Sequence, residues 1–284
     1  SCYIKISGSK PGKLCYNMLQ TYTRTRRRRF LWPKTAETTQ LFLPERVYCV
    51  EKYPWVCYNV VARVTADIIG AKRGEAMYTG SGIIKIFAGQ TGRTFAKKMC
   101  AYLGTQLGDS ETIKFSEGNI FVRVNESIRD KDVYIVQPIG RQPNDEFVEL
   151  LFWIDAFKRA SANSVTAIIP YFSYAKGDKK DEPRVSIRAR VCADCIEAAG
   201  VDRLITMDLH APQVQGFFKK PVDHLYAKAL LCEYIRRSGI VGEDLVVVSP
   251  DAGSAKRARE YATELNCPVA IGDKMRVGHD EKAK

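Results

Sequence analysis

The stretch Thr206-Met-Asp-Leu-His-Ala-Pro-Gln-Val-Gln-Gly-Phe-Phe218 is the one around which the fold of this chain can be predicted. The apolar run at residues 203–207 predicts a buried strand, and Asp208 and His210 lie at its C-terminal end. Residues two apart in a strand share a face, so carboxylate and imidazole project together. In an open α/β sheet, ligands bind at this edge. An imidazole there could bind a magnesium nucleotide, act as acid or base, or only cap the strand, and the neighbouring stretches decide between these.

Outward from this stretch, strands and helices alternate from residue 83 onward. Apolar or alternating runs predict strands, and apolar residues at helical spacing predict helices. The expected strands cover residues 83–87, 119–125, 132–136, 165–169, 203–207, 245–249 and 269–271. The expected helices cover residues 94–107, 146–160, 187–199 and 252–265, and one more begins at Leu225. The alternation predicts the α/β class, with mostly parallel sheets flanked by helices and right-handed crossovers.

The composition favours a folded protein in a reducing compartment. The 284 residues, 45% of them hydrophobic, suffice for one large domain or two ordinary ones. No membrane-length apolar run and no signal peptide is recognisable, so we expect a cytoplasmic protein without a membrane partner. The nine cysteines are scattered and odd in number, which favours reduced thiols. Cys192 and Cys195 form a C-x-x-C in an expected helix, and helix packing is favoured there over zinc or redox chemistry.

Residues 1–76 differ from the rest of the chain. They hold 14 Lys and Arg against 5 Asp and Glu, which is +9 of the net charge of +12, and show no sustained helical or strand period. The run Arg24-Thr-Arg-Arg-Arg-Arg29 is typical of a nucleic-acid or membrane-surface patch. We hypothesise instead that Met77 is the true start and that residues 1–76 are a translated upstream sequence or a disordered leader. No nucleic-acid partner is then expected.

Two polar stretches lie in the first half of the α/β pattern. The turn Phe115-Ser-Glu-Gly-Asn119 offers an aromatic ring beside a carboxylate and an amide, which suits a purine base but is also common in turns. The charged run at residues 171–184 follows the strand expected at 165–169 and suits a phosphate-binding loop. Charge runs are more often a solvated surface, but this one lies at the same sheet edge as His210, which favours a function.

Two further stretches follow later strands. Asp251 ends one strand and opens a helix, where the helix N-terminus favours an anion and the carboxylate could hold a cation or act as an N-cap. Lys274 and Arg276 follow the strand at residues 269–271. Cations in such a position stabilise the charge that develops on a transferring phosphoryl group.

From about Ile83 to Arg276 the chain resembles the ribose-phosphate pyrophosphokinases, also called phosphoribosyl pyrophosphate synthases. The resemblance is carried by Phe115-Ser-Glu-Gly-Asn119, Asn144-Asp-Glu-Phe-Val-Glu-Leu-Leu151, Ile169-Pro-Tyr-Phe-Ser-Tyr-Ala175, Met207-Asp-Leu-His-Ala-Pro-Gln-Val-Gln-Gly-Phe-Phe218, Pro221-Val-Asp-His-Leu-Tyr226 and Val248-Ser-Pro-Asp-Ala-Gly253. This family transfers the diphosphoryl group of Mg-ATP to the 1-hydroxyl of ribose 5-phosphate and releases AMP. The resemblance implies tandem phosphoribosyltransferase-type domains, the first at residues 77–224 and the second, at residues 225–284, truncated.

The resemblance also implies ligands and residue roles. It implies ATP and ribose 5-phosphate as ligands, Mg2+ as cofactor, and a homo-oligomer, usually a hexamer. The implied ATP-binding residues are Phe115, Glu117 and Asn119 around adenine, and Lys176, Gly177, Asp178, Asp181 and His210 along the nucleotide. The implied metal-binding residues are His210 and Asp251, and the implied catalytic cations are Lys274 and Arg276.

The chain departs from the family pattern at three places. Lys176-Gly177 stands where the family usually has Arg-Gln, and a Lys ammonium cannot reproduce the fork of a guanidinium on phosphate. Asn119 replaces a carboxylate, and the chain ends at Lys284, before the family's ribose-5-phosphate loop. We therefore expect the 284-residue chain itself to be inactive or to aggregate. The alternative to the enzyme is a non-catalytic, synthase-like regulatory subunit, while a phosphoribosyltransferase that consumes the product is disfavoured.

Overall fold

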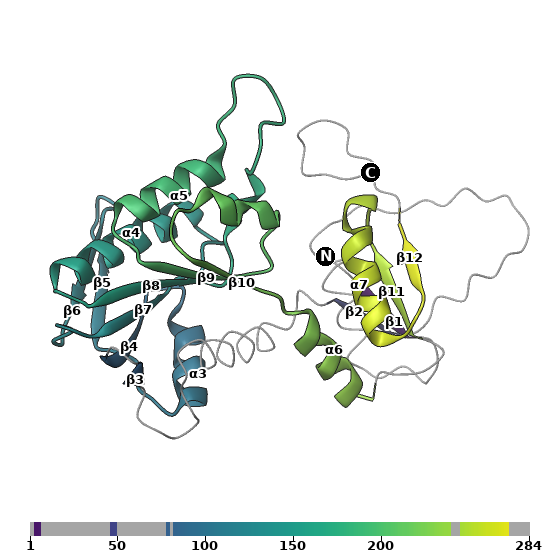
Figure 1. The fold of residues 1–284 in the computed structure, drawn as a ribbon, viewed down its shortest axis with the longest axis horizontal. Helices are drawn as coiled ribbons and strands as arrows, with labels where there is room; N and C mark the ends of the chain where they lie inside the picture. Colours follow the sequence, from purple (N-terminus) through teal and green to yellow (C-terminus); the bar gives the residue numbers. More distant parts are fainter. Residues whose placement is uncertain (1–2, 7–45, 50–77, 80–81, 240–244, 273–284) are drawn as a thin grey trace, which may run out of the picture. The chain divides into compact units, whose positions relative to one another are not determined.

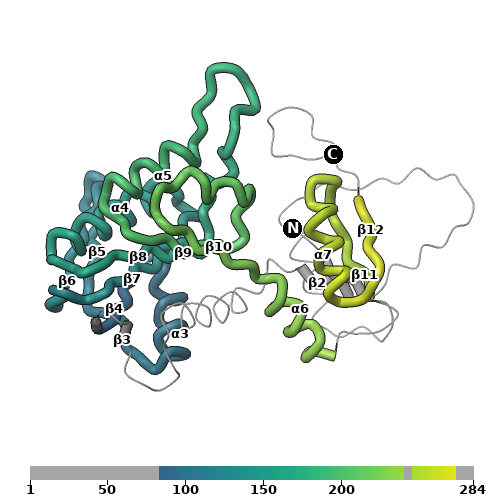
Figure 2. The backbone as a smooth tube through the Cα atoms, viewed as in Figure 1, coloured from purple at the N-terminus to yellow at the C-terminus, as the bar shows by residue number. Residues whose placement is uncertain are grey.

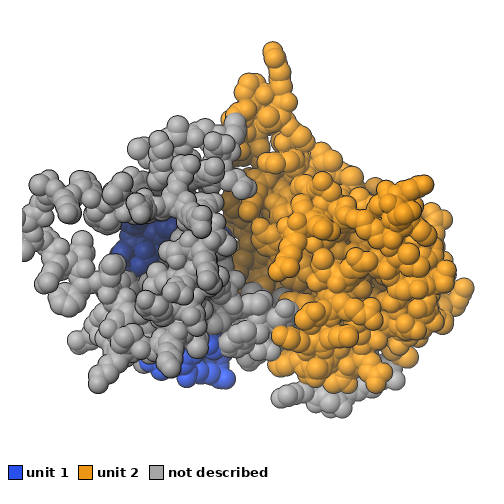
Figure 3. Space-filling model, turned by 180° about the vertical axis from the view of Figure 1, so that it is seen from behind, with its two compact units in different colours: residues 1–54, 228–284 blue, residues 55–227 orange. Residues whose placement is uncertain are grey.

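The computed structural model describes residues 3–6, 46–49, 78–79, 82–239 and 245–272. The chain divides into two compact units, drawn in orange and blue in Figure 3. The larger unit comprises residues 55–227, and the smaller unit combines residues 1–54 with residues 228–284. Each unit is described by itself below.

The larger unit is built on a six-stranded sheet in the order β10-β9-β8-β7-β4-β3 (Figure 1). Its strands are β3 (Tyr78–Thr79), β4 (Gly82–Ala88), β7 (Asp132–Val136), β8 (Ser164–Ile169), β9 (Arg203–Met207) and β10 (Val222–Leu225). Neighbours from β4 to β10 are parallel, and β3 pairs with β4 in the antiparallel sense. Parallel strands are covered on both faces, which is why every residue of β7 is buried. The predicted α/β class is confirmed.

Helices cover both faces of this sheet. Helices α4 (Pro143–Arg159) and α5 (Arg188–Ala198) lie on one side and α3 (Arg93–Leu103) on the other, as the tube in Figure 2 also shows. The core under α4 contains Phe87, Trp153 and Phe157. The ring centroid of Phe157 lies 5.0 Å from that of Phe87 and 5.4 Å from that of Trp153. Helix α4 begins three residues before the expected start, because Pro143 already has the backbone angle that a first helical turn needs.

A separate hairpin packs against α4. It consists of β5 (Ser110–Lys114) and β6 (Ile120–Val124), which pair in the antiparallel sense. The predicted turn between them is confirmed: the Phe115 N–H donates to the Asn119 carbonyl at 2.9 Å, and Gly118 has a φ of 92°. That positive φ suits a residue without a side chain.

The smaller unit contains the parallel strands β11 (Leu245–Ser249) and β12 (Val269–Ile271) with helices α6 (Lys228–Arg237) and α7 (Ala255–Leu265). Two short strands, β1 (Tyr3–Ile6) and β2 (Arg46–Cys49), extend this sheet in the order β12-β11-β1-β2. They were not predicted, because pairing with an open edge is a non-local event that no period within residues 1–76 reveals. Met77 and the arginine run lie outside the described residues.

Two further predicted helix boundaries are wrong. The helix expected at residues 94–107 ends at Leu103, where Gly104 closes it with a φ of 72°. The helix expected from Leu225 begins instead at Lys228, and Leu225 is the last residue of the unpredicted strand β10. The register pairs Leu225 with Met207 at the end of β9. A neighbouring parallel strand therefore overrides the apolar spacing on which the helix was predicted.

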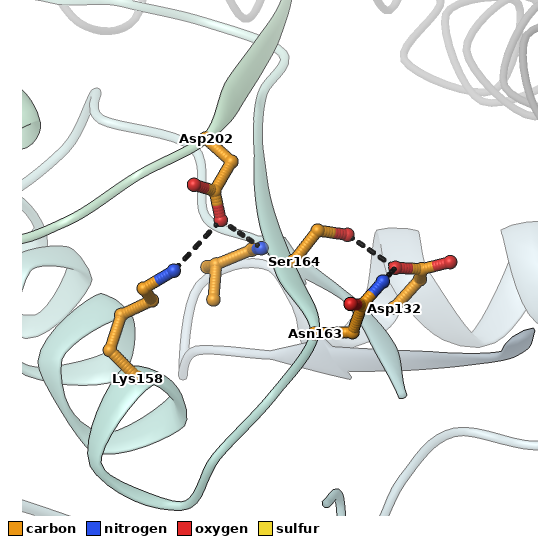
Figure 4. Close-up of polar contacts among 6 residues, drawn as sticks. Asp132, Lys158, Asn163, Ser164 and Asp202 are labelled. Atoms are coloured by element: carbon orange, nitrogen blue, oxygen red, sulfur yellow. Dashed lines mark hydrogen bonds and ion pairs between the residues drawn. The ribbon is translucent and has the colours of Figure 1, made fainter. Parts of the chain in front are cut away.

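Side-chain hydrogen bonds tie the amino ends of the strands together (Figure 4). The carboxylate of Asp132, only 4% exposed, accepts from Asn163 Nδ2 at 2.8 Å and from the Ser164 hydroxyl at 2.6 Å. Beside it, the carboxylate of Asp202 accepts from the Val165 N–H at 2.8 Å and pairs with Lys158 at 3.1 Å. These bonds fix the edge of the sheet opposite to the one where ligands bind in α/β folds.

Replacing Asp132 by alanine is expected to lower the free energy of unfolding by about 1–3 kcal/mol, because the donors of Asn163 and Ser164 lose their buried acceptor. Urea denaturation monitored by circular dichroism measures the change. Asp155→Ala is the matched control, since this carboxylate forms an exposed pair with Arg159 one helical turn away and is expected to contribute less than about 0.5 kcal/mol. Equal losses in the two variants would contradict the structural role of Asp132.

Candidate site at the carboxyl edge of the larger unit

The loop that follows β9 carries His210. Asp208 leaves the strand with a φ of 44°, and its N–H donates to the Leu225 carbonyl at 2.9 Å. A non-glycine residue in this left-handed region is uncommon, and Asp is one of the types that tolerate it. His210 is exposed, as the prediction of a ligand-binding imidazole requires. The loop continues into the short helix η3 (Pro212–Phe217).

The loop that follows β8 reaches the His210 loop. After the short helix η2 (Ser173–Lys176), the carboxylate of Asp178 accepts from Gln213 Nε2 at 3.1 Å. Gln213 lies three residues after His210, so this bond brings two of the predicted site segments together. Lys176 is exposed, and Asp181 forms an exposed ion pair with Lys179 at 3.7 Å. Gln213 was not predicted as a site residue, although it lies within the stretch Thr206–Phe218.

Gly177 is buried under the side chain of Arg188. A Cβ atom at Gly177 would lie 2.7 Å from Arg188 Nε and 2.9 Å from Arg188 Cβ, too close for either contact. The backbone of Gly177 is itself fixed, because its carbonyl accepts from the Ala189 N–H at 3.1 Å and its N–H donates to the Tyr174 carbonyl at 2.9 Å. Arg188 therefore leaves no room for a side chain at position 177.

Replacing Gly177 by alanine is expected to cost about 1–3 kcal/mol of stability, because the added methyl group overpacks against Arg188. The φ of −102° at Gly177 is ordinary, so the backbone adds no strain. In the Arg188→Gly background, which removes both Nε and Cβ, the same substitution should cost less, by about 0.5 kcal/mol or more. A thermal-unfolding double-mutant cycle measures this, and additive effects of the two substitutions would contradict the proposed packing.

The predicted adenine turn lies near the N-terminus of α4. Phe115, Glu117 and Asn119 are all exposed, and the Phe115 ring lies 6.4 Å from that of Phe121. Directly before the turn, Lys114 pairs with Asp145 in the first turn of α4 at 2.6 Å. The turn therefore lies at the end of α4 that follows β7, on the carboxyl side of the sheet.

A second contact joins the N-terminus of α4 to η2. The hydroxyl of Tyr174 hydrogen-bonds to Asn144 Oδ1, and the Tyr174 ring meets Phe147 edge-on at 5.7 Å. Desolvation raises the pKa of Tyr174 above its ordinary value, so its phenol keeps the proton that it donates. The contacts Lys114–Asp145, Tyr174–Asn144 and Gln213–Asp178 thus order the predicted segments along one edge.

A buried polar network supports the same edge and was not predicted. The carboxylate of Glu149, 3% exposed, accepts from the Gln90 N–H at 3.0 Å, the Thr112 hydroxyl at 2.8 Å, Gln137 Nε2 at 2.9 Å and Trp153 Nε1 at 3.4 Å. One side chain therefore joins the loop after β4, the hairpin, the end of β7 and α4. In the sequence, Glu149 resembles a solvated position of an amphipathic helix.

The remaining predicted site residues lie elsewhere. Asp251 belongs to the smaller unit, where its Oδ1 accepts from the Ser254 N–H at 2.8 Å. This bond confirms the N-cap that the sequence left open beside an ion-binding role. Lys274 and Arg276 lie outside the described residues.

Comparison with known proteins shows to which family the chain is related. Residues 84–200 match the model of the N-terminal domain of ribose phosphate pyrophosphokinase. The chain is 49% identical over 193 residues to the ribose-phosphate pyrophosphokinase of Chlorobaculum tepidum, and 48% identical over 201 residues to that of Caldanaerobacter subterraneus. These alignments cover 68% and 71% of this chain. The chain belongs to the ribose-phosphate pyrophosphokinase family.

A solved structure of the family has the same fold. The crystal structure of phosphoribosylpyrophosphate synthetase from Mycobacterium smegmatis superposes with a TM-score of 0.63 at 38% identity, over 68% of this chain and 65% of that one. The chain spans 59% and 63% of the length of the Chlorobaculum and Caldanaerobacter pyrophosphokinases. These relatives are named ribose-phosphate pyrophosphokinases.

Within this ribose-phosphate pyrophosphokinase fold, Cys192 of the C-x-x-C packs in the hydrophobic core. Cys192 is buried in α5, and burial raises the pKa of its thiol to about 12. A thiol that keeps its proton is a poor nucleophile. Across the described ranges, no group of three or more His, Cys, Asp and Glu residues is placed to hold a metal by itself. No helix in the same ranges is both long and apolar enough to cross a bilayer.

Proposed function

We propose that the chain acts in ribose-phosphate pyrophosphokinase chemistry, the transfer of the diphosphoryl group of Mg-ATP to the 1-hydroxyl of ribose 5-phosphate with release of AMP. This reaction supplies activated ribose for nucleotide biosynthesis. The observation that carries the proposal is the order of three predicted site segments along the carboxyl edge, linked by Lys114–Asp145, Tyr174–Asn144 and Gln213–Asp178. This is the edge where α/β sheets bind ligands.

In the proposed complex the adenine turn and the two loops divide the nucleotide between them. The exposed ring of Phe115 stacks on adenine, and Glu117 and Asn119 bind the edge of the base. Lys176 supplies a cation to the phosphates, while Asp178 holds its loop against Gln213. Asp181 and Gly177 belong to the same loop, and His210 contacts the phosphates from the end of β9.

The donors fit a nucleotide-bound magnesium ion. His210 is exposed and Asp251 is half-buried, so each can be reached by an ion that keeps several of its waters. We propose that His210 and, independently of it, Asp251 are Mg2+ ligands, and the ion would offset phosphate charge when bound. The reaction then needs positioning and charge stabilisation, for which Lys274 and Arg276 are the proposed cations.

The proposal is tested in two steps. The purified 284-residue chain is expected to bind Mg-ATP in isothermal titration calorimetry. A chimera in which residues 1–272 are followed by the corresponding C-terminal part of the Chlorobaculum relative is expected to form AMP and phosphoribosyl pyrophosphate, detected by 31P NMR. Failure of both the chain and the soluble chimera to bind Mg-ATP would contradict the proposal.

The second candidate is a non-catalytic regulatory subunit, which Lys176-Gly177 favours because this pair replaces the usual Arg-Gln of the family. A soluble chimera that binds Mg-ATP without turnover, yet changes the activity of an added synthase, would support this candidate. We also propose a cytoplasmic location and a homo-oligomer, a hexamer by resemblance to the family.

A further inference from the structure

The loop that carries His210 begins with an unfavourable backbone conformation. Asp208 has a φ of 44°, and such left-handed residues cost roughly 1–2 kcal/mol unless the surrounding structure holds them. The turn at Asp208 directs the next N–H, that of Leu209, back toward β10. Some group on β10 must therefore receive this N–H, since Leu209 is buried and an unsatisfied amide there would be costly.

That group is the imidazole of His224. The register places His224 beside Thr206 in the neighbouring parallel strand, and its Nε2 accepts from the Leu209 N–H at 2.9 Å. A ring nitrogen that accepts carries no proton, so the neutral ring has its proton on Nδ1. The side chain of His224 thus fixes the residue that lies between Asp208 and His210.

His224 also touches the far end of the same loop. Gln215 Nε2 lies 3.3 Å from His224 Nδ1 and donates to the Pro212 carbonyl at 2.8 Å. Because Nδ1 already holds the ring proton, Nδ1 and Gln215 Nε2 are both donors, so Gln215 lies near the ring but makes no hydrogen bond to it in this tautomer. The ring of Tyr226 packs against the imidazole with centroids 4.4 Å apart. Both ends of residues 208–215 therefore meet one half-buried histidine.

We propose that His224 is a positioning residue, which holds the loop at residues 208–215 so that His210 is presented to the phosphates of a magnesium nucleotide. The phosphate-binding part of this inference rests on the proposed function. The loop-holding part rests on the bond from Leu209 and the left-handed turn at Asp208 alone. His224 does not itself touch the nucleotide in this proposal.

Two substitutions separate hydrogen bonding from packing. His224→Phe keeps a ring against Tyr226 but has no acceptor for the Leu209 N–H. His224→Gln keeps an acceptor, because the amide oxygen reaches about as far as Nε2. Tyr226→Phe is the matched control, since it preserves the ring that packs on the imidazole and leaves the bond to Leu209 untouched.

Amide hydrogen exchange of Leu209, followed by NMR in the full 284-residue chain, reports on the loop without any ligand. His224→Phe is expected to accelerate this exchange about tenfold or more, whereas His224→Gln and Tyr226→Phe are expected to leave it within about threefold of the wild type. Unchanged exchange in folded His224→Phe would overturn the inference. Calorimetry with Mg-ATP provides the second readout, with an expected loss of affinity of about fivefold to tenfold in His224→Phe and recovery in His224→Gln.

The two readouts also separate this inference from the proposed function. No Mg-ATP binding by the wild-type chain would overturn the proposed function, while faster Leu209 exchange in His224→Phe would still support the loop-holding role. Equal losses of affinity in His224→Phe and His224→Gln, with equal shifts in the unfolding temperature, would overturn the positioning role, because packing alone would then explain them.

Discussion

Replacing Glu149 by alanine is expected to lower the free energy of unfolding by about 3–5 kcal/mol, the largest stability effect of any substitution considered for this protein. The carboxylate of Glu149 is the common acceptor for the Gln90 N–H, the Thr112 hydroxyl and Gln137 Nε2. Each buried donor that loses its acceptor costs about 1–3 kcal/mol, and water that enters the new cavity recovers part of this. Urea denaturation of the variant and the wild type measures the difference.

Two further variants make this prediction specific. Glu149→Gln keeps the shape of the side chain but replaces one acceptor with a donor, so it should lose less stability than alanine and provides a measurable variant if Glu149→Ala does not fold. Glu111→Ala is the matched control, because Glu111 forms an exposed ion pair with Arg123 at 3.0 Å and should contribute less than about 1 kcal/mol. Similar losses in Glu149→Ala and Glu111→Ala would show that Glu149 is not the hub of the network.

Replacing His210 by alanine is expected to weaken Mg-ATP binding by about 10- to 150-fold, the largest functional effect expected here. A hydrogen bond to a charged group contributes about 1.5–3 kcal/mol, which corresponds to this range of affinity. Stability should change by less than about 0.5 kcal/mol, because the side chain is exposed. Calorimetry with Mg-ATP and thermal unfolding measure the two quantities in the same preparation.

A control variant excludes a general loss of binding. Asp155→Ala changes an exposed residue on α4 that has no role in the proposed site and should bind Mg-ATP like the wild type. If His210→Ala retains wild-type affinity, the proposed role of the strand-end imidazole is wrong. If it loses affinity together with several kcal/mol of stability, His210 would instead hold the loop structurally.

The element types and the candidate segments could be predicted because both depend on local patterns. The continuous apolar runs that became β8 and β9 and the helical spacing of α4 were recognised from residues close together in the chain. Asp208 and His210 were located correctly at the end of β9 for the same reason. The short strand β10 could not be predicted, because its four residues are stabilised by pairing with β9, which precedes it by a loop and η3.

The functional details that were missed all depend on contacts between distant parts of the chain. Nothing in the local sequence distinguishes Glu149 from a solvated helical glutamate, and only the hairpin packed on α4 buries it. Gly177 and Arg188 pack against each other, although they lie on either side of a charged loop. Gln213 and His224 lie within stretches that carry the family resemblance, which was the available signal, but their roles follow only from the bonds to Asp178 and Leu209.

Local sequence was thus sufficient to predict the α/β class, the strand ends that bear His210 and Asp251, and the family. Hydrophobic period and short motifs are properties of neighbouring residues, and these predictions depend on them. The tertiary structure decided which of these segments meet: the larger unit joins the turn at residues 115–119, the Lys176 loop and the His210 loop through side chains up to 35 residues apart in sequence. It also decided that Glu149 and His224 hold the edge in place. Burial and hydrogen-bond partners arise only when distant segments pack, and no local pattern encodes them.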